Sequence, residues 1–254
     1  MPIKQMSRVH ISATLIGCAL LLSSPTKGAA QDPRDPSARK LTQTLVIGFV
    51  GGFVQSDDLR HSEVQIARHL QATYADSVQV HVFRNRQRTK AHQSVVAFFN
   101  AAANEQGQAP HVILFGHSWG ASAVVYLARE LAQDGIPVAL TIQVDSVRKH
   151  GQDDSVIPPN VAEAVNFYQS KGIIHGRPRI IAADPVRTSV LGNFQFEYDT
   201  EPAECHAYPW YNRLLFKGHT SIECDPRVWS QVDRLIETRI APLTPPAIAA
   251  QLMK

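Results

Sequence analysis

The feature that most constrains the fold is the pentapeptide Gly116–Gly120, Gly-His-Ser-Trp-Gly, which has the pattern G-x-S-x-G. It follows the apolar run Val112–Phe115 and precedes the segment Ala121–Ala128, so it lies where a buried strand becomes a helix. In such a sharp turn Ser118 needs small neighbours, because the backbone is strained and adjacent strands leave no room for Cβ atoms. The turn presents the serine hydroxyl at the amino end of a helix, where the dipole favours negative charge. The alternative is a glycine-rich turn between a core strand and a helix that has no catalytic role.

Composition predicts one globular domain without a nucleic-acid interface. The 254 residues, 44% of them hydrophobic, are enough to bury a full core. Three of the 25 basic residues lie in the first 30 residues, which contain no acid, so the remaining 22 balance the 22 acidic ones. Nucleic-acid binding needs a clustered positive excess. The only local basic run, Arg84–Lys90, is expected to be a solvated loop between a strand and a helix.

Residues 1–30 have the pattern of an export signal. A basic start is followed by the apolar stretch Val9–Leu22 and by small residues, and cleavage is expected after Ala30. This pattern predicts a secreted or periplasmic protein. The alternative is a lipoprotein anchored at Cys18, which ends the box Leu-Ile-Gly-Cys. The apolar stretch is shorter than the roughly 20 residues that span a bilayer, so no stable membrane span is expected.

The cysteine count supports a disulfide. Removal of the signal leaves Cys205 and Cys224, an even number in a chain that reaches an oxidising compartment. We therefore predict a bridge between them, which would close a loop containing His219. Two unpaired buried thiols are the alternative.

The order of apolar and helical patterns predicts an α/β fold, a mostly parallel central sheet with crossover helices. We expect a polar leader over residues 31–43, the folded domain over 44–240 and a tail over 241–254. Strands are predicted near 45–48, 78–83, 112–115, 138–144 and 179–182. Helices are predicted near 59–74, 92–104, 121–133, 160–170 and 227–238.

A serine hydroxyl becomes a good nucleophile only with a histidine base, usually oriented by an acid. Asp145 directly follows the strand 138–144, and Asp184 follows the strand 179–182; we favour Asp145, because Pro185 makes Asp184 equally suited to start a turn. His219, in a predicted loop before the last helix, is the favoured base, and His206 is the alternative.

Acyl transfer also needs donors for an oxyanion. The glycine-rich segment Gly48–Phe53 follows the first strand and can approach a ligand closely. We assign the donors to the amides of Phe49 and Trp119, with Val50 as the alternative to Phe49.

Together, the glycine-rich loop, the elbow around Ser118 and the late His219 resemble the α/β-hydrolase superfamily, specifically its lipase-like and thioesterase-like members, over about residues 44–240. The resemblance implies a mostly parallel sheet with helices on both faces, Ser118 as nucleophile, and ester or thioester hydrolysis without metal or organic cofactor. In many members the acid occupies the place of Asp184, whereas in some lipases it occupies that of Asp145. The oxyanion loop has Ile47-Gly48 where His-Gly is common.

These features predict an exported serine hydrolase that cleaves carboxylic esters through an acyl-enzyme on Ser118, with a small-molecule or lipid-like acyl ester as substrate. A thioesterase or amidase with the same residues, and a non-catalytic binding protein, are the alternatives. No metal is expected, since the histidines lack an H-E-x-x-H spacing. The segment 146–178 could form a lid. Four aromatic residues before His219 could line an acyl pocket, with core packing equally compatible: Tyr208, Trp210, Tyr211 and Phe216.

Overall fold

The computed structural model describes residues 44–75, 77–103 and 110–240, all within one compact unit, Lys40–Lys254. The predicted export signal, the lipoprotein cysteine Cys18, the leader and the tail lie outside the described residues. In the described part of the chain, no helix combines the length and the apolar character needed to cross a bilayer.

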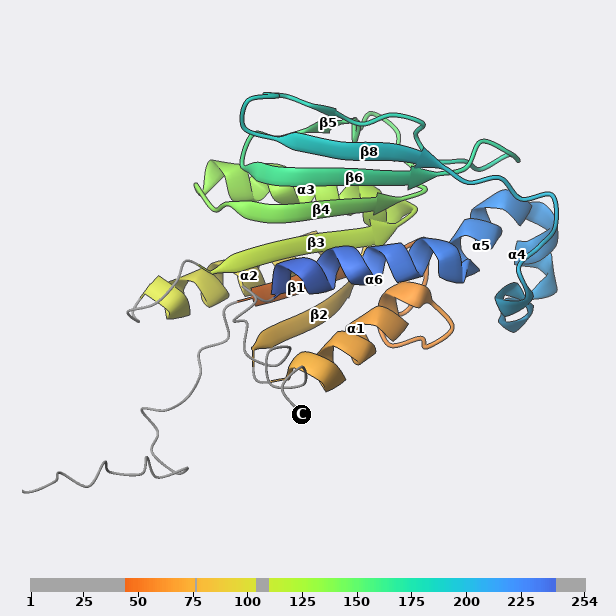
Figure 1. Cartoon of the computed structure of the whole chain (residues 1–254), viewed down its shortest axis with the longest axis horizontal. Helices are drawn as coiled ribbons and strands as arrows, with labels where there is room; N and C mark the ends of the chain where they lie inside the picture. Colours follow the sequence, from red (N-terminus) through yellow and green to blue (C-terminus); the bar gives the residue numbers. More distant parts are fainter. Residues whose placement is uncertain (1–43, 76, 104–109, 241–254) are drawn as a thin grey trace, which may run out of the picture. The chain divides into compact units, whose positions relative to one another are not determined.

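The centre of the unit is a six-stranded sheet in which all neighbouring strands are parallel. The strand order is β2-β1-β3-β4-β6-β8 (Figure 1). The central strands are nearly continuous apolar runs, as expected for strands covered on both faces. The prediction of a mostly parallel sheet is confirmed. The strands are β1 (Thr44–Val50), β2 (Val78–Arg84), β3 (His111–His117), β4 (Val138–Val144), β6 (Val161–Tyr168) and β8 (Ser189–Gln195).

Helices cover both faces of this sheet. Helices α2 (Arg88–Ala103) and α3 (Trp119–Gln133) pack on one face through an apolar cluster that includes Val95 and Leu127. Helices α1 (Ser62–Tyr74) and α6 (Pro226–Ile240) pack on the other through a cluster that includes Leu70 and Val232 (Figure 1). Helix α6 begins at Pro226, directly after Asp225, whose carboxylate accepts the amide of Arg227.

The remaining elements are short. A second sheet pairs β5 (Val156–Ile157) with β7 (Ile181–Ala182). A 3-10 helix η2 (Ala203–Ala207), α4 (Trp210–Leu215) and α5 (Lys217–Cys224) lie beyond the carboxyl ends of the strands (Figure 1). These ends form the edge of the sheet at which Ser118 lies.

The prediction of a helix at 160–170 is wrong, because these residues form β6 between β4 and β8. Its apolar residues Val161, Ala164, Val165 and Tyr168 recur at helical spacing, yet the strand is buried on both faces, which removes the alternation typical of a half-exposed strand. The predicted strand 179–182 is reduced to β7, and the polar β8 was missed. Since Phe167 is 1% exposed in the sheet, the segment 146–178 cannot be a lid as a whole.

Candidate active site

Ser118 occupies a strained turn between β3 and α3. Its φ of 57° and ψ of −125° are rare for a residue with a side chain. Its amide donates a hydrogen bond to the carbonyl of Val144 at 3.0 Å, and its own carbonyl accepts the amides of Ser122 and Val147, both at 3.2 Å. These bonds tie the turn to α3, to the end of β4 and to the loop that follows β4, so they hold the strained geometry in place.

The two glycines of the pentapeptide are required by close backbone packing. A Cβ on Gly116 would lie 2.8 Å from the carbonyl oxygen of Phe49, and a Cβ on Gly120 would overlap the same carbonyl. Gly51 is the third close approach, because its Cβ would lie 2.9 Å from the Cβ of Ser118. The end of β1 and the residue after it therefore press directly against the serine turn.

His219 lies within hydrogen-bond distance of both proposed partners. Its Nε2 is 2.9 Å from the Oγ of Ser118, and its Nδ1 is 2.6 Å from the Oδ2 of Asp145. The expectation that His219 lies in a loop is wrong, since it is part of helix α5. Gly218 lets this helix approach closely, because a Cβ there would crowd the side chain of Gln169.

Asp145 is completely buried directly after β4, with a φ of 44°. Its Oδ1 accepts the amides of Gly176 at 2.6 Å and Gln169 at 3.2 Å, and its Oδ2 accepts the side-chain amide of Gln169 at 2.9 Å. These bonds compensate for burial of the carboxylate and fix the oxygen that faces His219.

The alternative residues lie elsewhere. Asp184 begins a turn: its carboxylate accepts the amide of Val186 at 2.9 Å and its carbonyl accepts the amide of Thr188 at 2.9 Å. His206 is exposed in η2, beside the disulfide. The structure therefore brings Ser118, His219 and Asp145 together.

The assignment of an oxyanion donor to Phe49 does not fit the structure. Phe49 lies inside β1, paired with Phe83 on one side and Gly116 on the other, so its amide belongs to the sheet. Val50, the alternative, also lies within β1. Gly51, the first residue after the strand, is the one that approaches the side chain of Ser118, and the prediction placed the strand end two residues too early. Trp119 is the first residue of α3, where amides have no partner within the helix.

A second cluster of buried titratable groups lies behind this site. The ring of His117 stacks on that of His219 with centroids 4.5 Å apart, and its Nδ1 is 3.7 Å from the carboxylate of Glu223. Glu223 also bonds the Nδ1 of His61. Burial lowers the pKa of His117 to about 4, which keeps that ring neutral at pH 7. Burial raises the pKa of Glu63 to about 8, and the neighbouring Glu223 adds to this shift.

The charges in this cluster favour an ionised Glu223. Burial opposes charge on Glu223, but the neighbouring His117 and the bonded His61 lower its pKa below the ordinary value. Burial likewise opposes charge on His61, and the bond to Glu223 raises its pKa. Because Glu223 lies one helical turn after His219 on α5, its bond to His61 anchors that helix to the start of α1.

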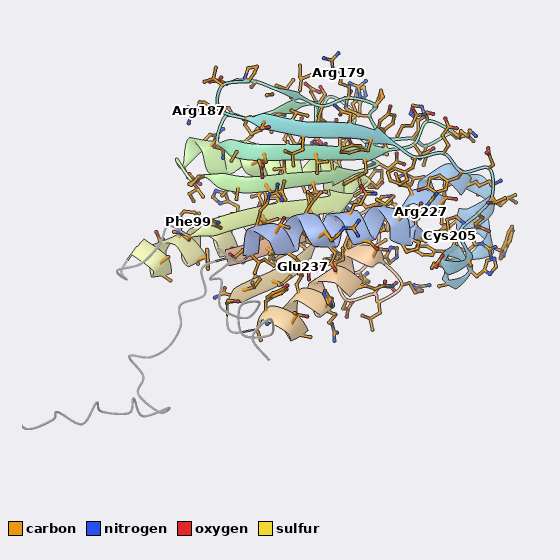
Figure 2. The ribbon with its side chains drawn as sticks, viewed as in Figure 1. Phe99, Arg179, Arg187, Cys205, Arg227 and Glu237 are labelled. Carbon is orange, nitrogen blue, oxygen red and sulfur yellow. A yellow bond between two sulfur atoms is a disulfide. The ribbon has the colours of Figure 1, made fainter. Side chains whose placement is uncertain are left out.

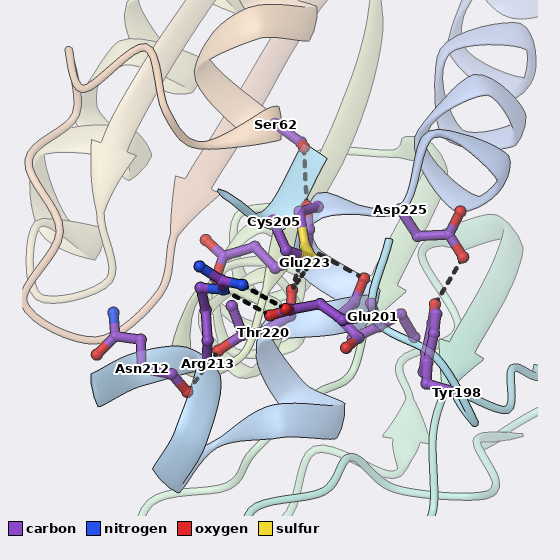
Figure 3. The surroundings of a disulfide bond; sticks show 12 residues. Ser62, Tyr198, Glu201, Cys205, Asn212, Arg213, Thr220, Glu223 and Asp225 are labelled. Atoms are coloured by element: carbon purple, nitrogen blue, oxygen red, sulfur yellow. Dashed lines mark hydrogen bonds and ion pairs between the residues drawn. A yellow bond between two sulfur atoms is a disulfide. The ribbon is translucent and has the colours of Figure 1, made fainter. Parts of the chain in front are cut away.

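A disulfide joins the last residue of the same helix, α5, to η2. Cys205 and Cys224 are joined, with Cα atoms 5.3 Å apart, as the sequence predicted. Figure 3 shows the bridge beside Thr220 and Glu223, which belong to α5. Around it, Arg213 forms an ion pair with Glu201 at 2.6 Å.

The aromatic residues that precede His219 do not form one pocket wall. Tyr208 is buried and packs edge-to-face on His61, whereas Trp210 and Tyr211 are 71% and 49% exposed. Trp210 and Tyr211 pack against each other on α4. Their place at the surface leaves them available to a ligand but does not define an acyl pocket.

Within the described residues, three groups have nitrogen and oxygen atoms close enough to hold a metal ion. One is His117, Asp145 and His219, in which Asp145 and His219 already bond each other. The others are the buried His61, Glu63 and Glu223 and the more exposed His69, Asp233 and Glu237.

No protein-family model matches the sequence, and a sequence search of curated proteins finds no match. Comparison of the structure matches the RedJ thioesterase of Streptomyces coelicolor, with 13% identity over 83% of this chain and 96% of that one, at a TM-score of 0.39. It also matches human thioesterase 2, with 10% identity over 78% and 96%, at a TM-score of 0.42. A hydrolase of the α/β superfamily from Xanthomonas campestris matches with 13% identity over 69% and 95%, at a TM-score of 0.33.

The deciding observation is in the chain itself. A six-stranded parallel sheet carries helices on both faces, with a serine turn after β3 and a histidine on a late helix. This is an α/β-hydrolase-like fold. At these identities and TM-scores the matched proteins say nothing of this chain's substrate, so the functional argument rests on the geometry around Ser118.

Proposed function

We propose that this chain is an exported serine hydrolase that cleaves carboxylic esters through an acyl-enzyme on Ser118. The observation that supports it best is the hydrogen-bonded series from Ser118 Oγ to His219 Nε2 and from His219 Nδ1 to Asp145. A serine, a base and an orienting acid in this order are the parts that nucleophilic acyl transfer requires.

The mechanism follows from the order of these contacts and from the tautomer that Asp145 favours. Asp145 accepts a hydrogen bond from the Nδ1–H of His219 and stays ionised, so Nε2 carries no proton and can take the proton of Ser118. Ser118 Oγ attacks the ester carbonyl, and the protonated His219 then gives its proton to the departing alcohol. A water molecule, deprotonated by His219, hydrolyses the acyl-enzyme and restores Ser118.

The negative oxygen of the tetrahedral intermediate needs donors fixed before the reaction. We assign one to the amide of Trp119, at the first position of α3, and the other to an amide of Gly52 or Phe53 in the turn after β1. The close approach of Gly51 to Ser118 supports this assignment. Each such donor typically contributes on the order of 3 kcal/mol to stabilisation of the transition state.

Turnover of matched substrates tests the proposal. Purified protein and its Ser118→Ala variant are compared on an oxygen ester, a thioester and an amide that share one acyl group. The proposal expects hydrolysis of the oxygen ester that the variant lacks. Faster turnover of the thioester or amide would assign the same residues to a thioesterase or amidase. Absence of turnover on a broad ester panel would favour a binding protein.

We also propose export, with cleavage after Ala30. The disulfide supports it, since such bridges persist in oxidising compartments. The mass of the mature chain purified from the native host tests the proposal. A chain that begins at Gln31 is expected, and a chain that begins at a lipidated Cys18 would instead establish a lipoprotein.

A further inference from the structure

The rim beside Ser118 carries an exposed aromatic pair. Phe53, in the turn after β1, is 77% exposed and packs edge-to-face on Trp119 with ring centroids 5.7 Å apart. Trp119 follows Ser118 directly in the chain, so the pair forms one wall beside the proposed nucleophile.

Two cations lie on the faces of these rings. The ammonium of Lys149 is 5.7 Å from the centroid of Trp119, and the guanidinium of Arg86 is 5.1 Å from that of Phe53. They come from different loops, since Arg86 follows β2 and Lys149 follows β4. The loop of Lys149 is tied to the serine turn, because the amide of Val147 donates to the carbonyl of Ser118 at 3.2 Å.

A buried amide holds Lys149 in this position. The Oδ1 of Asn85, a residue only 2% exposed, accepts a hydrogen bond from the Lys149 ammonium at 2.9 Å. The Nδ2 of Asn85 donates to the carbonyl of Gly52 at 2.6 Å. The cation is therefore built into the same turn that presents the proposed oxyanion donors, and it is not a freely moving surface side chain.

Lys149 and Arg86 form no ion pair with an acidic residue in the part of the chain that the structure describes. Burial lowers the pKa of Lys149, and the nearby charges of Arg86 and Arg88 lower it further. Of these three cations only Arg88 forms an ion pair, with Glu130 at 2.7 Å. Holding Lys149 and Arg86 together without a carboxylate costs free energy, which an anion bound between them would recover.

We propose that the substrate carries an anionic group, a carboxylate or a phosphate, that binds between Lys149 and Arg86 while its ester carbonyl lies at Ser118. The ester then approaches along the Phe53–Trp119 wall, which contacts the apolar part of the substrate. This inference rests on the proposed hydrolase function and narrows its substrate class. It also gives a role to Arg86 within the basic run Arg84–Lys90, whose charge pattern predicts a solvated loop.

Two pairs of esters test the inference, each pair differing only in one charge. On the acyl side, p-nitrophenyl hydrogen glutarate is compared with p-nitrophenyl glutaramate. On the alcohol side, 4-acetoxybenzoate is compared with 4-acetoxybenzamide. For at least one pair, kcat/KM at low ionic strength is expected to favour the anion by about tenfold or more, and the preference should weaken with added salt.

A variant of Lys149 and a control variant show whether this cation causes the preference. Lys149→Met should reduce the ratio of kcat/KM for the anionic ester to that for the neutral ester about tenfold, whatever its effect on turnover of the neutral ester. Arg187→Met is the matched control, because Arg187 lies at the opposite end of the sheet (Figure 2) and should leave both values unchanged. Competitive inhibition by inorganic phosphate or by glutarate then tells which anion class binds more tightly.

The possible results distinguish failure of the proposed anion site from failure of the proposed hydrolase function. Equal turnover of both members of each pair, by a protein whose Ser118 reacts with a fluorophosphonate probe, overturns the anion site and leaves the hydrolase proposal standing. An anion preference that survives in Lys149→Met also overturns it. Absence of both turnover and labelling overturns the hydrolase proposal, and the anion site falls with it.

Discussion

Removal of the Cys205–Cys224 disulfide should cost about 3 kcal/mol of folding free energy. The bridge joins residues 19 positions apart. For a closed loop of this length the chain-entropy relation gives a loss of about 11 cal/mol/K in the unfolded chain, or roughly 3 kcal/mol at 25 °C. The closed loop contains His219, and the bridge joins η2 to the last residue of α5. Loss of the bridge should therefore increase the mobility of His219 and also lower the free energy of unfolding of the whole domain.

The assay compares the parent protein with a Cys205→Ala/Cys224→Ala double variant, since single variants would leave a free thiol. Urea unfolding should give the difference of about 3 kcal/mol, and the melting temperature should fall by roughly 6–12 °C for a domain of this size. Labelling of Ser118 by a fluorophosphonate, measured well below the melting transition, should become slower.

A reducing agent supplies the control. It should lower the stability of the parent protein towards that of the double variant and leave the double variant unchanged. Alkylation of both cysteines in unreduced parent protein would show that the bridge is absent. A difference below about 1 kcal/mol between oxidised parent and variant would refute the loop-entropy reasoning.

Three further substitutions test other parts of the site. Asp145→Asn should lower kcat by roughly 10³- to 10⁴-fold because it no longer fixes the tautomer of His219, whereas Asp184→Asn should stay near the parent value; the reverse result would make Asp184 the acid. Gly120→Ala places a Cβ against the Phe49 carbonyl and should cost about 1–3 kcal/mol in thermal unfolding, so unchanged stability would contradict the packing. Glu63 has a pKa raised from 4.5 to about 8 by burial, so its unfolded form ionises first as the pH rises. Relative to Glu63→Gln, the parent should therefore lose about 1.4 kcal/mol of unfolding free energy per pH unit between about pH 4.5 and 8, and a pH-independent difference would count against this.

The local signals around Ser118 were sufficient to predict the core of the fold. An apolar run, a G-x-S-x-G turn and an alanine-rich segment specify β3, the turn and α3 to within two residues at each end. The same reasoning selected Asp145 and His219 because carboxyl ends of parallel strands meet at one edge of the sheet. The structure brings those side chains to Ser118, and their catalytic roles stay predictions.

The errors have identifiable physical causes. In β6, burial on both faces removes the two-residue alternation, and the remaining apolar spacing happens to be helical. In β8, polar residues such as Ser189 and Asn193 conceal an edge strand. For Phe49, a strand boundary wrong by two residues moved the proposed oxyanion donor into the sheet.

Other features had no local signal at all. His61 and Glu223 bond each other across 162 positions, and nothing near either residue indicates the other. The same holds for Asn85 and Lys149, which lie 64 positions apart in loops that only the parallel sheet brings together. Pairs of this kind require the strand order, which single-sequence patterns did not fully supply.

Reaction of Ser118 with a fluorophosphonate tests the central claim most directly. The oxidised protein is labelled, digested and analysed by mass spectrometry, with Ser118→Ala and the neighbouring Ser122→Ala as a matched pair of variants. The account predicts a single adduct on the peptide that contains Ser118, retained in Ser122→Ala and absent from Ser118→Ala. An adduct that persists in Ser118→Ala, or an unlabelled parent protein that still hydrolyses esters, would contradict it.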